Sequence, residues 1–458
     1  MADTKKKKRA SLSSFTILLI ILVALAVITV IMAACGVEGI EGATLSGVLT
    51  APVFGFQDAI GVCLFVMILG GFLGIVTETG ALDAGIAALV HKLKGNELVL
   101  IPILMFIFSI GGTTYGMCEE TVPFYLLLAA TMVAAGFDSL TGAAVVLLGA
   151  GVGVMGSTVN PFAVGVAVDA LNGIGVSVNQ GIIIALGVII WLVSLAIAIV
   201  FVMRYAKKVK ADPKFSYSYE DREKFNAQWE LDESGAAARE FSLRKKIVLV
   251  IFVAAFIIMI VGVMNLGWWF PQMAAEFVTL SILVMFIGGT GKDGVGEAKM
   301  VDAFGAGASS LVPVALIIGL ARGVNHVLTE GMISDTMLNA ASNLVAGMSG
   351  PLFVVCLLLI FFVLGFVVPS SSGLAVLAMP IFAPLADTVG IPRWIIVAAY
   401  QFGQYAMLYI APTGLVMATL QMLDMKMSHW FKFVWPMMVF TLVFGAILLS
   451  ICSVVFAV

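Results

Sequence analysis

Charge is scarce in this 458-residue chain: 11% of the residues are Asp, Glu, Lys or Arg, whereas 61% are hydrophobic, and the mean hydropathy is +1.13. A soluble chain of this length could not bury so much apolar surface. Several uninterrupted apolar runs reach the roughly 20 residues that a helix needs to cross about 30 Å of hydrocarbon. The composition therefore excludes a soluble enzyme and indicates a polytopic protein surrounded by membrane lipid. The net charge of −3 gives no reason to expect a nucleic-acid partner.

Cysteine and histidine are also rare, with five and three copies. The cysteines form no Cys-x-x-Cys pair, and the histidines at 91, 326 and 429 are far apart in the sequence. This excludes a disulfide framework and the usual zinc-ligand spacings. An intramembrane metalloprotease would need His-Glu-x-x-His, which is missing. A serine protease would need a Gly-x-Ser-Gly turn, and Ser372-Gly373 lacks the leading glycine. We therefore expect no enzyme, no catalytic residue and no resident cofactor.

The second half of the chain repeats the first. Phe54-Gly55 and Thr77-Glu78-Thr79-Gly80 match Phe304-Gly305 and Leu328-Thr329-Glu330-Gly331 at an offset of about 250 residues. In each half, two polar interruptions follow in the same order. An inverted repeat with interrupted helices is the construction of secondary transporters, whose substrate binds where the interruptions meet. We therefore expect an all-α polytopic membrane protein with inverted-topology repeats.

Lys and Arg are concentrated in a few segments, and the positive-inside rule converts this into an orientation. The basic run Lys5–Arg9 and the charged segment 205–245 are expected in the cytoplasm, and the C-terminus outside, in a bacterial cytoplasmic membrane. Segment 15–34 could be a secretory signal, but its counterpart at 274–290 favours a first transmembrane helix. About nine spanning helices are expected, at 15–34, 58–77, 140–170, 181–203, 246–266, 274–290, 308–326, 394–424 and 433–456.

Two further segments are expected to be re-entrant hairpins. Segment 98–136 would enter from the cytoplasm and segment 350–388 from outside. The first arm of the former, 98–111, would measure roughly 21 Å as a helix, which is short for a span. Three regions follow along the chain: a first repeat over 1–204, a linker with a connecting helix over 205–266, and a second repeat over 267–458.

Four polar interruptions, at 111–120, 156–161, 369–373 and 411–414, are expected to form the site. Irregular backbone at membrane depth is tolerated only inside protein or around a cavity. Helix ends there expose amides, which favour anions, and carbonyls, which favour cations. The expected substrate ligands are Thr113, Thr114, Tyr115, Glu119, Glu120, Ser157, Thr158, Asn160, Ser370, Ser371, Ser372 and Thr413. Coupling to Na⁺ or H⁺ is expected, and Na⁺ could bind at Gly112, Ser157, Asn160, Ser372 and Thr413.

Glu119 and Glu120 are the sharpest individual signal, because ionised groups at membrane depth are costly and usually functional. They could bind a cationic substrate group, bind Na⁺ or carry a proton. One of them could instead cap the second hairpin arm, since acids favour the first turn of a helix. Tyr115 and Tyr409 either line the site or pack against it.

These motifs carry a family resemblance. Glu119–Phe124, Gly156–Phe162, Phe241–Lys246 and Val368–Gly373 resemble the YfcC-type branch of the anaerobic C4-dicarboxylate carrier family, and the resemblance covers essentially the whole chain. That family belongs to the ion transporter superfamily, whose members move a transport domain against a fixed dimeric scaffold. The resemblance therefore implies an elevator mechanism and a homodimer.

The resemblance leaves the substrate open. Relatives of the YfcC type are usually linked to basic amino acids such as arginine and ornithine, whereas the family name indicates dicarboxylates. Dicarboxylate carriers of the superfamily typically have Ser-Asn-Thr at both tips, but this chain has Gly112–Gly116 and Pro369–Gly373, with two acids beside the first. Two carboxylates attract an amino or guanidinium group and repel a dianion. We expect antiport of a basic or other amino acid, with ion-coupled dicarboxylate transport as the alternative. A channel is disfavoured, because the hairpins favour occlusion.

Overall fold

The computed structural model describes residues 14–37, 39–82, 84–85, 88, 96–118, 121–122, 124–173, 175–221, 242–266, 268, 270–290, 294–331 and 333–457. Within these ranges the regular elements are helices and there is no strand, so the all-α prediction is confirmed. The first half contains α1 (Ser14–Ala34), α2 (Leu45–Asp58), α3 (Ile60–Glu78), α5 (Leu100–Tyr115), α6 (Phe124–Ala134), α7 (Ser139–Met155), α8 (Val166–Gly173) and α9 (Gln180–Ala211).

The connecting helix α12 (Leu243–Leu266) precedes the second half. That half contains α13 (Phe270–Gly289), α14 (Glu297–Ser310), α15 (Val312–Glu330), α16 (Ile333–Val345), α17 (Gly350–Val367), α18 (Ser371–Thr388), α19 (Trp394–Leu408), α20 (Gly414–Met422) and α21 (Met427–Val455). Three of the predicted interruptions fall between α7 and α8, between α17 and α18, and between α19 and α20. The fourth is shorter than predicted, because α5 continues through Gly111–Tyr115.

The two halves repeat each other in the way their helices end. After α6, Gly136 has φ 85° and Phe137 N donates to Met132 O at 2.9 Å. After α18, Gly390 has φ 69° and Ile391 N donates to Ala386 O at 3.0 Å. These are equivalent Schellman caps.

A second pair of caps closes the short helices that follow the breaks. Val176 N donates to Leu171 O, and Met425 N donates to Leu420 O, both at 2.9 Å. The residue that precedes each donor in the sequence has a positive φ, which is 74° at Gly175 and 47° at Asp424. The junctions α6–α7 and α18–α19 therefore share a cap and the same place in the order of helices, as do α8–α9 and α20–α21.

Nine helical segments in the described ranges are long and apolar enough to cross a membrane. The predicted number was also nine, but the members differ. Glu97–Thr114, Gly350–Val367 and Ser371–Thr388, predicted as hairpin arms, meet the length criterion. The prediction of an arm over 98–111 ended that helix too early. α5 continues to Tyr115 and ends at Gly116, whose backbone lies in the left-handed region. Length alone therefore does not distinguish arms from spans.

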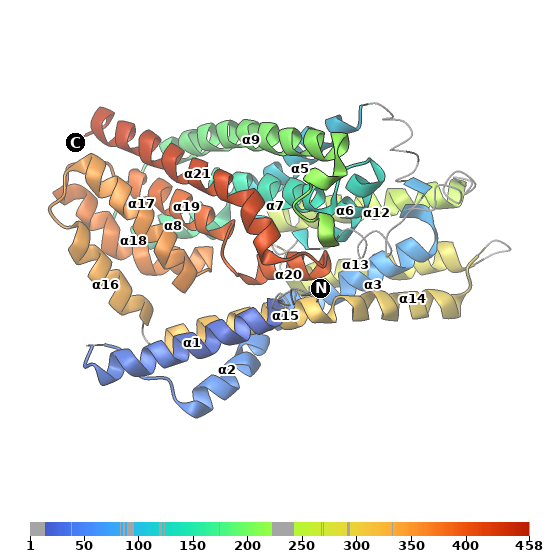
Figure 1. Cartoon of the computed structure of the whole chain (residues 1–458), viewed down its shortest axis with the longest axis horizontal. Coiled ribbons are helices and arrows are strands. Elements are labelled where there is room, and N and C mark those ends of the chain that lie inside the picture. The colour runs from blue at the N-terminus through green and yellow to red at the C-terminus, as the bar shows by residue number, and fades with distance from the viewer. Residues whose placement is uncertain are drawn as a thin grey trace, which may run out of the picture.

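Two helices, α2 and α14, were not predicted. Both are 14 residues long and rich in small residues. α2 packs on α15 and α14 packs on α3, so each half contributes a short helix to a long helix of the other half. We refer to α1–α3 with α13–α15 as the paired-helix unit. Figure 1 shows α1, α2, α14 and α15 along the lower edge of the molecule.

Glycine contacts hold the paired-helix unit together. Gly319-x-x-x-Gly323 on α15 lies against Gly55 of α2, and Gly70-x-x-x-Gly74 on α3 lies against Gly307 of α14. A β-carbon on Gly55 or on Gly307 would overlap the backbone of the helix that faces it. Small residues four positions apart allow helix backbones to approach closely within a membrane.

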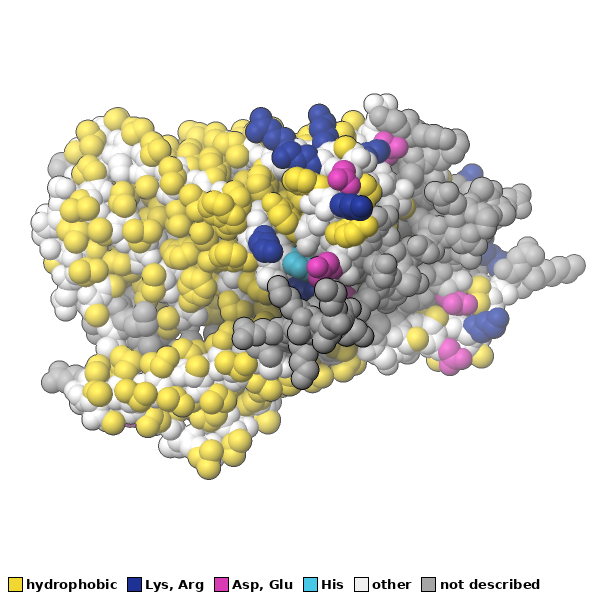
Figure 2. Space-filling model, viewed as in Figure 1, with side chains coloured by type: hydrophobic (Ala, Val, Ile, Leu, Met, Phe, Trp, Pro, Cys, Tyr) yellow, Lys and Arg dark blue, Asp and Glu magenta, His cyan; other side chains and the backbone are white. Residues whose placement is uncertain are grey.

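We call α5–α9 with α17–α21 the site unit, because these helices contain all four interruptions. The helices α12 and α16 are assigned to neither unit. α5 and α6 pack on α7, and α17 packs on α19 and α21. Hydrophobic side chains cover most of the left part of the face in Figure 2, while Lys and Arg gather near its upper middle, over the C-terminal part of α9. The last turn of α9 carries Lys208 and Lys210.

We predict that Gly307→Ala lowers stability by about 1–3 kcal/mol, the usual cost of overpacking, because the added methyl group has no room against Gly70. The measurement is the melting temperature of the purified protein in detergent. Gly305→Ala on the same helix is the matched control, since nothing lies within 4 Å of a β-carbon there. Equal melting temperatures for the two variants would contradict the close crossing.

Candidate functional site

The end of α5 and the break after α7 are joined by hydrogen bonds. Thr113 Oγ1 donates to Gly156 O at 2.7 Å. In return, Thr158 donates to Thr113 O through its backbone N at 2.9 Å and its Oγ1 at 3.0 Å. Thr113 is 1% exposed. We call the end of α5 the first tip and the break at 156–161 the first break. These hydrogen bonds join them in one buried polar cluster.

Pro161 explains why α7 cannot continue, because proline has no amide hydrogen to donate. Asn160 compensates locally: its Oδ1 accepts from Phe162 N at 2.9 Å, and its Nδ2 donates to Ser157 Oγ at 2.9 Å. Both Ser157 and Asn160 are completely buried. Gly116 passes directly over this amide, and a β-carbon on Gly116 would lie 2.7 Å from Asn160 Oδ1. The turn therefore requires glycine for space as well as for its φ of 79°.

The second tip, which is the interruption at 369–373, receives hydrogen bonds from α19. Ser370 caps α18 by accepting from Gly373 N at 3.2 Å, and its Oγ lies 3.4 Å from Ser372 Oγ. Tyr400 OH donates to Ser371 O at 2.7 Å. All three serines are partly exposed, so the N-terminal amides of α18 and these hydroxyls are reachable by a ligand.

Two glutamines on α19 were missed in the sequence. Gln401 and Gln404 are 1% and 2% exposed. Gln404 Nε2 donates to Pro369 O at 3.4 Å, whereas Gln401 Nε2 and Gln404 Oε1 have no hydrogen-bond partner in the described structure. An unsatisfied buried polar group costs roughly 1–3 kcal/mol. The available signal was two amides inside an otherwise apolar run, outside any interruption.

Two further buried hydroxyls lie at the second break, the interruption at 411–414: Thr413 Oγ1 within it and Tyr409 OH just before it. The described residues provide no hydrogen-bond partner for either. Trp430 Nε1 donates to Tyr409 O at 2.8 Å and so fixes the end of α19. Donors and acceptors are therefore available along α19 and the second break, and a polar ligand, an ion or water can satisfy them.

A small cavity joins the first tip to the second break. Its volume is about 10 Å³, close to the ~10–15 Å³ that one water molecule requires. Tyr409 lines it, opposite Thr121 and Tyr125, whose hydroxyl oxygens are 2.9 Å apart. The cavity is too small for an amino acid or a dicarboxylate, so the conformation is closed at this point.

The remaining predictions concern the Na⁺ ligands, Thr114, and three residues near the first tip. Of the predicted Na⁺ ligands, Gly112, Ser157 and Asn160 lie at the first tip and the first break. No hydrogen bond among the described residues links them to Ser372 or Thr413. Thr114 is not in the cluster, because its hydroxyl donates to Ile110 O of its own helix at 2.7 Å. The side chain of Tyr115, together with Glu119 and Glu120, lies outside the described residues.

Known proteins resemble this chain over most of its length. The family model described as the C4-dicarboxylate anaerobic carrier matches residues 39–454. An uncharacterized protein of Haemophilus influenzae is 47% identical over 408 residues, which cover 89% of this chain and 78% of that protein. An Escherichia coli protein with the provisional name basic amino acid antiporter YfcC is 33% identical over 384 residues, 82% of this chain and 74% of that protein.

Two solved structures align with the chain at low overall similarity. One is Neisseria gonorrhoeae MtrF, described with a class of antimetabolite efflux pumps: it is 18% identical, the alignment covers 98% of this chain and 96% of that chain, and the TM-score is 0.42. The other is the Alcanivorax borkumensis YdaH transporter, which is 13% identical with 96% and 98% coverage and a TM-score of 0.41. Such scores establish no shared arrangement. The family model and the two relatives do suffice: this chain belongs to the C4-dicarboxylate anaerobic carrier family and is a multi-pass membrane transporter.

Proposed function

We propose that the protein is a secondary active transporter that exchanges a basic or other amino acid by elevator-type alternating access. The observation that supports this best is the distribution of the interruptions along the helices. All four lie in the site unit, and the helices of the paired-helix unit contain none of them. In this proposal the paired-helix unit is the fixed scaffold, the site unit moves, and the two tips are re-entrant.

The contact between the units supports relative movement. Where α20 meets α15, a β-carbon on Gly414 would lie 3.5 Å from Ala321 Cβ and 3.6 Å from Ile318 Cα, which is ordinary van der Waals distance. Inside the paired-helix unit the corresponding positions leave no room at all. At this position the two units touch at ordinary distance and are not interlocked backbone to backbone, as relative movement of the units would require.

We further propose a homodimer that forms through the paired-helix unit. On α2, Leu45, Leu49 and Val53 follow one another at four-residue spacing and are 77%, 68% and 58% exposed. Such a stripe fits a second copy of the chain or lipid. The orientation inferred from Lys and Arg completes the proposal: a bacterial cytoplasmic membrane, a cytoplasmic N-terminus and linker, and an external C-terminus.

The proposed substrate class follows from Glu119 and Glu120, which flank the first tip in the sequence, and agrees with the name of the E. coli relative. A unit charge a few Å away contributes several kcal/mol at an effective dielectric constant of about 20, and each 1.4 kcal/mol is about tenfold in affinity. Coupling to Na⁺ or H⁺ is part of the proposal, with the hydroxyls and carbonyls of the first cluster as the Na⁺ ligands.

The alternative is ion-coupled transport of a C4-dicarboxylate, which the family description favours. In that case the free amides at the start of α18 and the amide of Gln401 would bind carboxylate groups, and the two acids would serve the coupling ion. Counterflow in proteoliposomes with arginine, ornithine, succinate and malate distinguishes the two substrates.

We predict that Glu119→Gln or Glu120→Gln reduces counterflow of arginine and ornithine at least tenfold, because each removes an attractive charge beside the tip. The variant with the greater loss identifies the ligand, and the milder one the helix cap. Glu297→Gln, an exposed acid in the first turn of α14, is the control. Wild-type rates in both variants would contradict the role of the acids, and counterflow of succinate without any basic amino acid would establish the alternative.

We also predict that Gln401→Leu raises the KM of the transported substrate by about 5- to 150-fold, the equivalent of the 1–3 kcal/mol of one unsatisfied buried group, without lowering the melting temperature. Thr131→Val is the control, since the Thr131 hydroxyl is satisfied by Leu127 O on α6. An unchanged KM would show that the glutamine amide does not contact substrate.

The orientation can be tested in intact cells with a membrane-impermeant maleimide. A cysteine replacing exposed Lys214 should be labelled only after permeabilisation, whereas one replacing exposed Ser177 should be labelled at once. The reverse pattern would overturn the orientation without affecting the family assignment.

A further inference from the structure

Asp138, at the α6–α7 junction, is a buried carboxylate that accepts four hydrogen bonds. Its Oδ1 accepts from Thr141 N at 2.8 Å and Thr141 Oγ1 at 2.6 Å, which caps α7. Its Oδ2 accepts from Tyr205 OH at 2.6 Å and Ser216 Oγ at 2.5 Å. Capping needs only Oδ1. The second oxygen therefore serves another purpose, which is to bind α9 and the segment that follows it.

That segment, residues 212–221, is called the strap here. It turns back along α9, because Tyr217 N donates to Tyr205 OH at 3.2 Å and the two rings stack at 5.7 Å. Its side chains alternate: Ser216 and Ser218 are buried, whereas Phe215, Tyr217 and Tyr219 are each 40% exposed. The strap consists of two 3₁₀ turns, Pro213–Phe215 and Tyr219–Asp221, joined by a turn at 217–218. One side of it, with the two serines, therefore lies against the molecule, and the rings lie on the other side.

The strap also reaches the second half of the chain. Glu220 Oε2 lies 4.0 Å from Lys426 Nζ at the start of α21. This exposed pair adds little energy, but it shows where the strap ends. The strap therefore runs from the α6–α7 junction to the α20–α21 junction.

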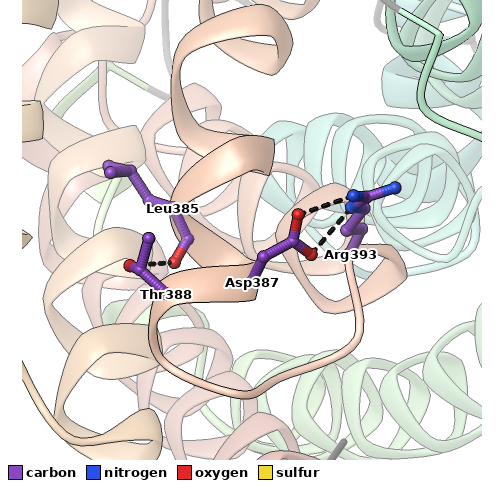
Figure 3. A network of polar contacts seen from close by, with 4 residues as sticks. All are labelled: Leu385, Asp387, Thr388 and Arg393. Atoms are coloured by element: carbon purple, nitrogen blue, oxygen red, sulfur yellow. Dashed lines mark hydrogen bonds and ion pairs between the residues drawn. The ribbon is translucent and has the colours of Figure 1, made fainter.

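At the equivalent position at the other end of the site unit, no segment among the described residues fills the space. The helix caps described above make the α18–α19 and α8–α9 junctions the counterparts of the two junctions that the strap bridges. Between them lies an open cleft of about 340 Å³, lined by Ser177, Asn179 and the 387–394 turn. Here the charged groups bind each other: Arg393 Nε and Nη2 donate to Asp387 at 2.8 and 2.5 Å (Figure 3).

We propose that the strap is a plug. It fills a cleft between the α6–α7 and α20–α21 junctions, which we call the linker side, and Asp138 Oδ2 binds it there. The corresponding cleft between the α18–α19 and α8–α9 junctions, on the far side, stays open to solutes. The site unit is then closed between its two halves on the linker side, and the first part of the linker belongs to that unit. The proposal does not depend on which substrate is carried.

The test is the reactivity of single cysteines, in a variant without the five native cysteines, toward a water-soluble maleimide. Cysteines at Tyr217 and Tyr219 should react at least tenfold faster than a cysteine at Ser218. Ser218 is the preferred buried reporter, because its hydroxyl contacts Ser216 and not Asp138. Adding Asp138→Asn should raise the reactivity at position 218 at least tenfold, since the amide nitrogen cannot accept from Tyr205 and Ser216, while asparagine still caps α7.

Two controls keep the result interpretable. Asp387→Asn, in the far-side cleft, should leave position 218 protected. Ser216→Ala, which removes the donor on the strap and leaves the carboxylate and its cap intact, should also expose position 218. Two results would contradict the proposal that the strap is a plug. One is equal reactivity at positions 217, 218 and 219 in the protein that retains Asp138. The other is a position 218 that stays protected in both the Asp138→Asn and the Ser216→Ala variant. None of these measurements uses transport, so they stand apart from the proposed function.

Discussion

The close approach of glycine backbones between the two halves is the constraint on which the rest of the structure depends. Neither α2 nor α14 has a side chain at Gly55 or Gly307, so each can lie directly on the backbone of a helix from the other half. Association of helices in lipid relies on such packing, because burial of apolar surface gives little advantage there. The contact is made twice, in exchanged roles, and it joins α3 and α15 in one unit, against which α20 packs through α15.

The sequence was sufficient to predict the elements whose signal is contained within them. Hydropathy identifies α1, α9, α13 and α21, and Pro161 and Pro412 mark breaks because proline cannot donate within a helix. α2 and α14 were missed for a physical reason: they are short, with many small residues, and a partner distant in the sequence stabilises them. The helix caps after α6 and α18 are alike, as are those after α8 and α20. The inverted repeat across a membrane stays a prediction.

The site was predicted in the same uneven way. Thr113, Ser157, Thr158 and Asn160 do come together, because polar residues in a break must satisfy one another when they are buried. Gln401 and Gln404 were overlooked because they lie within a regular helix, where nothing local separates a functional amide from a solvated one. Only the arrangement in space shows that they are buried beside the second tip. The expected Na⁺ ligands do not all meet, because equivalence in the repeat does not imply contact. Ser157 and Asn160 lie in the first cluster, Ser372 lies at the second tip beside Ser370, and Thr413 lies in the second break.

The strap has a consequence for the symmetry of the proposed mechanism. Tyr205 and Ser216 donate to Asp138 within the site unit, so in that mechanism these hydrogen bonds travel with the unit and favour neither an inward nor an outward conformation by themselves. What they do fix is the shape of the two ends of the unit. One end carries residues 212–221, and the other has an open cleft beside Ser177 and Arg393. A solute that approaches from the two ends therefore meets different surfaces, although the helices at those ends follow the same order.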